Sequence, residues 1–155
     1  MMRLKLIKNK MKIKIAIIVS DFNKDITSKM EKNAEKVAKS LNAEIVKKVH
    51  VPGTFEIPFA ANNLLKNKKI DAIVVLGVVI QGETYHDVVI VNTISSKLVD
   101  LSLKYNKPIG FGIIGPRVTW QQAEKRAEEY AKRAVKAALE MVKISKNNLL
   151  TKKLL

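Results

Sequence analysis

The sequence has no cysteine among its 155 residues. A disulfide framework, a thiol nucleophile and a thiolate metal site are therefore excluded. Its only histidines, His50 and His86, lie far apart in the sequence, so we expect no metal site built from several histidines of one chain. No apolar run approaches the roughly 20 residues of a membrane span, and no secretory signal pattern follows the basic amino terminus. We therefore expect a cytoplasmic protein without a bound metal.

Acidic residues are also scarce: 14 stand against 29 basic ones, for a formal net charge of +15. A charge of this size suggests nucleic-acid binding. However, ten of the fifteen excess charges lie in residues 1–14 and 141–155, and the middle of the chain is nearly balanced. Aromatic residues make up only 5%, and none interleave with the basic residues as stacking on single strands requires. We therefore favour a solvated lysine surface and expect no nucleic-acid partner.

What the sequence does contain is enough apolar material for a core, at 47% of the residues. A chain of this length typically forms one domain. We divide it into a basic amino-terminal arm at 1–11, a central domain at 12–144 and a basic carboxyl-terminal tail at 145–155. The start codon can be Met1, Met2 or Met11.

Apolar periodicity predicts strands alternating with helices along the whole domain. Strands are expected at 13–19, 45–51, 72–79 and 109–114, and helices at 26–41, 57–65, 85–103 and 119–142. We expect Asp25 to cap the first helix, and Thr119 with Gln122 to form a capping box on the last. This alternation predicts an α/β fold: a four-stranded parallel sheet in a three-layer αβα sandwich, to which the arm could add a strand.

In such sheets ligands bind beyond the carboxyl ends of the strands. The segment after the third strand is the most informative, because Gly82 permits close approach and the first turn of the next helix attracts anions. We expect Thr84 to cap that helix with Asp87 as its partner, which outlines a phosphate pocket. The segment lacks the Lys-Ser/Thr of a nucleotide-binding P-loop. His86 lies in the same turn, as a proton-transfer group or as an ordinary surface histidine.

The remaining loops contain further candidates for ligand binding, and each of these residues could instead have an ordinary structural role. Glu56 could accept hydrogen bonds from ligand hydroxyls, or it could be an ordinary acid at a helix start. Phe22 would be oddly exposed without a stacked ring, whereas Phe111 suits either stacking or core packing. Arg126 and Arg117 could reach an anion or could be solvated surface charges. His50 is expected to be structural or exposed.

Four segments together resemble the lumazine synthase family of riboflavin biosynthesis, from about Lys12 to Lys143. They are Ser20-Asp21-Phe22-Asn23, Val51-Pro52-Gly53-Thr54-Phe55-Glu56-Ile57-Pro58, Val79-Ile80-Gln81-Gly82-Glu83-Thr84-Tyr85-His86 and Gln122-Ala123-Glu124-Lys125-Arg126-Ala127. Each is weak alone, but four in order at strand ends are specific. The resemblance implies a flavodoxin-like fold and a transferase that uses no cofactor. It would condense 5-amino-6-(D-ribitylamino)uracil with 3,4-dihydroxy-2-butanone 4-phosphate, giving 6,7-dimethyl-8-ribityllumazine, phosphate and water.

The resemblance also implies roles for individual residues. His86 would transfer protons, Glu56 would hold ribityl hydroxyls, and Arg126 would be the counter-charge of the phosphate. The other residues implied to bind the phosphate are Glu83 and Thr84. Those implied to bind the pyrimidine substrate are Phe22, Asn23, Thr54, Phe55, Val78, Val79, Ile80 and Phe111, the last from an adjacent subunit. The family forms homopentamers, some packed into sixty-subunit shells, and we expect a pentamer.

The chain departs from the family pattern beside the expected phosphate pocket. Gln81 stands where many relatives have arginine, and residues 115–118 replace a threonine-rich loop. A second basic residue near the phosphate is therefore not assigned, with Arg117, Lys132 and Arg133 as candidates. Two alternative functions remain at this point: an archaeal-type riboflavin synthase that joins two lumazines, and a non-catalytic lumazine- or flavin-binding protein.

Overall fold

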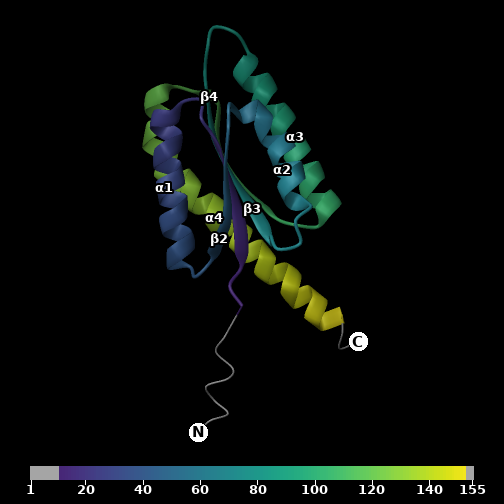
Figure 1. Cartoon of the computed structure of the whole chain (residues 1–155). Helices are drawn as coiled ribbons and strands as arrows, with labels where there is room; N and C mark the ends of the chain where they lie inside the picture. Colours follow the sequence, from purple (N-terminus) through teal and green to yellow (C-terminus); the bar gives the residue numbers. More distant parts are fainter. Residues whose placement is uncertain (1–10, 153–155) are drawn as a thin grey trace.

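The computed structural model describes residues 11–152, with side chains to residue 148, and shows four strands alternating with helices (Figure 1). The first half runs β1 (Lys14–Ser20), α1 (Lys24–Ser40), β2 (Glu44–Val51), a 3₁₀ turn η1 (Thr54–Glu56) and α2 (Ile57–Leu65). The second half runs β3 (Ala72–Ile80), α3 (His86–Tyr105), β4 (Ile109–Val118) and α4 (Trp120–Lys152). Of these residues, no helix is both long and apolar enough to cross a membrane.

The four strands form one parallel sheet in the order β2-β1-β3-β4, with helices on both faces. Successive strand residues face opposite sides, so each strand feeds two cores. In β1, Ile15 and Ile17 pack with α1 and α4, whereas Ala16 and Ile18 pack with α2 and α3. Figure 1 shows these two helix pairs on opposite sides of the sheet. The predicted α/β three-layer sandwich is therefore confirmed.

Small residues bring α4 directly against β4. The alanine stripe of α4, including Ala127, Ala131 and Ala134, is buried on the sheet. Gly110 of β4 lies so close that a Cβ there would collide with the backbone carbonyl of Ala134. This close approach packs the middle of α4 against the amino end of β4.

Several predicted boundaries were wrong. Asn23, with φ of 62°, is the N-cap of α1, and Asp25 lies in the first turn of the helix. β4 continues four residues beyond the predicted end, because Val118 still pairs with Ile80 of β3. α4 extends ten residues beyond Val142, the last residue of its stripe that is buried. The Thr119–Gln122 capping box is confirmed, with N–H to side-chain oxygen distances of 3.0 and 3.1 Å. The proposed arm strand lies outside the described residues.

Candidate active site

A cleft of about 340 Å³ opens where β1, β2 and β3 end, on the side of the sheet covered by α2 and α3. Its walls come from three loops that are distant in sequence, as parallel strand order requires. Most of the predicted site residues line it, namely Phe22, Thr54, Phe55, residues 78–80, Thr84 and His86. The arrangement therefore brings together side chains spread over more than sixty positions.

Two aromatic side chains form one exposed wall of this cleft. Phe22 is 70% exposed and Phe55 is 63% exposed. Their loops are tied together, because the N–H of Phe22 donates to the carbonyl of Pro52 at 3.0 Å. The N–H of Asp21 likewise donates to the carbonyl of Val51 at 2.8 Å. Two large apolar rings held open to solvent beside a cleft form a surface suited to a flat ligand ring.

Thr54 anchors the η1 turn beneath that wall. It is only 6% exposed and packs on Gly77 of β3, where there is no room for a Cβ. Glu56, at the end of η1, is exposed and does not itself line the cleft. A Cβ at Gly53 would lie 3.0 Å from Glu56 Oε2, so this carboxylate lies beside the cleft-lining Gly53. It is therefore within reach of a ligand that extends past the aromatic wall.

The opposite end of the cleft is formed by Gly82, Thr84 and His86, where α3 begins. A Cβ at Gly82 would meet nothing within 4 Å, so this part of the loop is open. The hydroxyl of Thr84 is hydrogen bonded to Nδ1 of His86. Nε2 of His86 has no partner among the side chains that the structure describes, so it is the ring nitrogen available to a ligand. The free N–H groups of the first turn of α3 add a preference for anions here.

The predicted capping box at the start of α3 is wrong. Tyr85 occupies the N-cap position, without a side-chain cap hydrogen bond. The hydroxyl of Thr84 is hydrogen bonded to His86 instead, and the carboxylate of Asp87 is hydrogen bonded to Arg117. Asp87 is 2% exposed, and its Oδ2 accepts a 2.7 Å hydrogen bond from the N–H of Arg117. The side chain of Arg117 is also 3.4 Å from Asp87 Oδ1.

Burial alone would raise the pKa of the Asp87 carboxyl. The hydrogen bond from the Arg117 N–H, the charge of the Arg117 side chain and hydrogen bonds from the N–H groups of Val88 and Asp87 together outweigh burial, so the pKa lies below its ordinary value. Asp87 is therefore a buried carboxylate in the wall of the cleft. Sequence reasoning missed this pair, because the two residues lie thirty positions apart and Arg117 had been expected in a loop.

Five predicted site residues do not line the cleft of their own chain: Glu56, described above, and Asn23, Glu83, Phe111 and Arg126. Asn23 donates from Nδ2 to the carbonyl of Val78 at 3.2 Å, which joins the first loop to β3. Glu83 is exposed in the loop beside the anion end. Arg126 is exposed on α4, which packs on the other face of the sheet (Figure 1).

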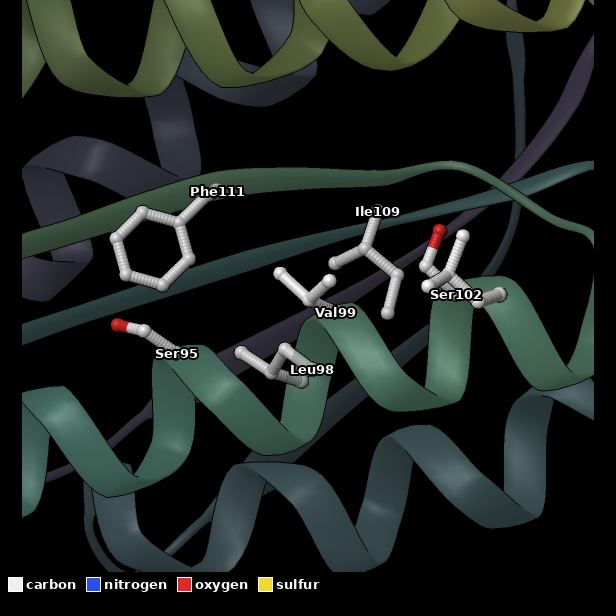
Figure 2. Close-up of a pocket in the computed structure, with 7 residues that line it drawn as sticks. Ser95, Leu98, Val99, Ser102, Ile109 and Phe111 are labelled. Carbon is white, nitrogen blue, oxygen red and sulfur yellow. The ribbon is translucent and has the colours of Figure 1, made fainter.

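Phe111 lies in a separate apolar groove of about 270 Å³ between α3 and the edge strand β4. Figure 2 shows its ring facing Ser95 and Val99 of α3, with Ile109 on the same side of β4. Phe111 is 41% exposed, so the core of its own chain does not enclose it. The groove belongs to the sheet edge rather than to the cleft.

His50 is part of a charged cluster that joins β2 to its neighbours. Its ring nitrogens lie 2.8 Å from Asp21 Oδ1 and 3.0 Å from Glu31 Oε1. Hydrogen bonds to Asp21 and then to Glu31 raise the pKa of His50. The prediction that His50 is structural or exposed is consistent with these contacts and with its exposed position. Within residues 11–148, no three acidic or histidine side chains form a group that could hold a metal ion.

The family comparisons agree on one activity. A family model described as 6,7-dimethyl-8-ribityllumazine synthase matches residues 12–146. The 6,7-dimethyl-8-ribityllumazine synthase of Metallosphaera sedula is 51% identical over 131 residues, which cover 84% of this chain and 87% of the relative. The enzymes of the same name from Staphylothermus marinus and Methanococcus vannielii are 48% identical over 134 residues and 47% identical over 131. These alignments cover 86% and 84% of this chain, and 89% and 93% of the relatives.

Proposed function

The chain belongs to the 6,7-dimethyl-8-ribityllumazine synthase family, and from this premise we propose how its cleft performs the reaction. The enzyme is a transferase of riboflavin biosynthesis. It condenses 5-amino-6-(D-ribitylamino)uracil with 3,4-dihydroxy-2-butanone 4-phosphate. The observation that carries the assignment of the site is the single cleft lined by Phe22, Thr54 and His86 at the ends of three strands.

The aromatic wall accounts for binding of the pyrimidine. Its flat ring stacks on Phe22, and Thr54 and Phe55 border it. Residues 78–80, at the end of β3, also line the cleft and present backbone groups to the polar edge of the ring. The ribityl chain extends toward Glu56, whose carboxylate accepts hydrogen bonds from its hydroxyls.

The phosphate of the second substrate occupies the opposite end of the cleft. It lies against the loop of Gly82, Glu83 and Thr84, where the first turn of α3 supplies N–H donors. Attack of the ring amine on the ketone then forms an imine and releases water. Elimination breaks the C–O bond to the phosphate, the chain isomerises, and ring closure releases a second water. His86 carries protons in these steps, a role typically worth a factor of ~10²–10⁴ in rate.

Holding both substrates in one cleft supplies much of the remaining acceleration, because it converts a bimolecular condensation into a reaction within one complex. The two ends of the cleft account for this: an apolar wall takes the ring, and an anion-binding turn takes the phosphate. Neither end requires a metal or an organic cofactor for the steps above.

We further propose that the enzyme acts as a homo-oligomer, with a pentamer as the expected size. The groove beside β4 is an apolar surface on an edge strand (Figure 2). Val99 and Leu103, which line it, are exposed. A second copy covering this edge would bury that surface. Phe111 and Arg126, which do not line the cleft of their own chain, would then serve the cleft of a neighbour.

The test is turnover by the purified protein. Both substrates together should yield lumazine and inorganic phosphate in equal amounts, followed by lumazine fluorescence and a phosphate assay. Lumazine supplied alone should yield no flavin. Flavin from lumazine alone, with no product from the two substrates, would instead identify a riboflavin synthase. Tight lumazine binding without any turnover would identify a binding protein.

A further inference from the structure

We propose that Arg117, held in place by Asp87, is the cation that this chain itself supplies to the phosphate-bearing substrate. The proposal rests on the function given above and adds a specificity-determining residue to it. Arg126 lies outside the cleft of its own chain, and Gln81 carries no charge. The wall of the cleft nevertheless holds a buried carboxylate, Asp87, whose partner is Arg117.

The backbone at Arg117 is in a left-handed conformation that residues other than glycine rarely adopt. Its φ is +59°, and Gly115, two residues earlier, has a φ of +125°. An arginine is strained in this region, so the conformation persists only where surrounding contacts fix it. Those contacts are the 2.7 Å hydrogen bond from its N–H to Asp87 and the pairing of the next residue, Val118, with β3. These contacts hold Arg117 against Asp87, which is a residue of the cleft wall.

The side chain of Arg117 is bracketed by the two neighbours of His86. Its guanidinium lies 5.1 Å from the centre of the Tyr85 ring, and it is paired with Asp87. Tyr85 and Asp87 directly flank His86 in the sequence. Arg117 itself does not line the cleft, but its partner Asp87 does, so the guanidinium is held against the wall of the cleft at the start of α3.

Most of the hydrogen-bonding capacity of Arg117 remains free for an anion. A guanidinium carries five N–H donors. Asp87 is its one acceptor in the part of the chain that the structure describes, at a long 3.4 Å. The side chain is 41% exposed, so an incoming phosphate can reach it. Asp87 is a positioning residue in this scheme, because it acts through Arg117.

The test compares Arg117→Gln with Lys104→Gln. Lys104 is a matched control, since it too is a cation over a tyrosine ring, 5.4 Å from Tyr105, at the far end of α3. We expect Arg117→Gln to raise the KM for 3,4-dihydroxy-2-butanone 4-phosphate by about tenfold or more. The KM for the pyrimidine should change less than twofold, and Lys104→Gln should match the wild type. Equal changes in both KM values, or a change in kcat alone, would overturn the proposal.

Asp87→Asn tests the positioning role. The amide oxygen can still accept the backbone hydrogen bond, but the charge that orients the guanidinium is lost. We expect a smaller rise in the same KM and an unchanged KM for the pyrimidine. A purely structural role for Asp87 would lower thermal stability while leaving the ratio of the two KM values at its wild-type level, and that result would refute positioning.

Calorimetric binding of inorganic phosphate separates this inference from the proposed function. Phosphate should bind the wild type and Lys104→Gln, and bind Arg117→Gln about tenfold more weakly. Unchanged binding to Arg117→Gln would refute the inference even if the wild type makes lumazine. Arg117-dependent binding in a protein without turnover would instead refute the function and retain the anion site.

Discussion

Truncation of Phe22 separates binding from folding more cleanly than any other change in the cleft. The ring is 70% exposed, so its removal exposes no core and leaves no cavity. Surface substitutions of this kind usually change the free energy of unfolding by less than about 0.5 kcal/mol. Stacking of a base on an aromatic side chain is worth about 1–3 kcal/mol by alanine substitution. Phe22→Ala should therefore weaken binding of the pyrimidine about 5- to 140-fold.

Phe59→Ala is the matched control, because Phe59 is 76% exposed on α2 and does not line the cleft. The assay is fluorescence titration with a non-reactive analogue of the pyrimidine substrate, together with urea unfolding of both variants. Phe22→Ala should lose affinity with an unchanged urea midpoint, and Phe59→Ala should retain both. Equal affinities for the two variants, or a loss of affinity matched by a loss of stability, would refute the stacking site.

Three further predictions concern catalysis, packing and pH. His86→Ala should lower kcat by ~10²–10⁴ without abolishing turnover; an unchanged kcat in a stopped-flow assay would remove His86 from the mechanism. Gly110→Ala should lower the free energy of unfolding by about 1–3 kcal/mol, since a Cβ there meets the Ala134 carbonyl; an unchanged urea midpoint would contradict that contact. The pKa of His50 is higher in the folded protein than its unfolded value of 6.5. Protonated His50 therefore stabilises the fold fully below pH 6.5, and this stabilisation is lost as pH rises through the folded pKa. Wild type should thus lose stability above about pH 6.5 relative to His50→Ala in urea unfolding, and parallel pH profiles would exclude this linkage.

The parallel sheet explains why so much of the cleft could be predicted from the sequence. Buried β-branched runs such as those of β1 and β3 identify strands, and parallel strands place their carboxyl ends at one edge. The loops carrying Phe22, Thr54 and His86 therefore had to converge, whatever their distance in sequence. The alternation of strands and helices could be predicted from the apolar pattern alone, without information on side-chain contacts.

Features set by contacts between distant residues could not be predicted in this way. The spacing of Asp87 from Thr84 is that of a capping partner. The structure shows that Asp87 instead accepts a hydrogen bond from Arg117, which lies near the end of β4. Periodicity likewise found the buried part of α4 but not its continuation, because residues 143–148 are mostly exposed and carry no apolar stripe. The sequence also could not show that α4 packs on the other face of the sheet, which keeps Arg126 out of the cleft of its own chain.

The central claim is that one cleft holds the ring at Phe22 and the phosphate at the start of α3. A crystal structure of the protein with a non-reactive pyrimidine analogue and inorganic phosphate tests it most directly. We predict the analogue ring stacked on Phe22, and a phosphate within hydrogen-bonding distance of the Gly82–Thr84 backbone, beside Nε2 of His86. Analogue or phosphate bound elsewhere, such as in the groove between α3 and β4 with the cleft empty, would contradict it.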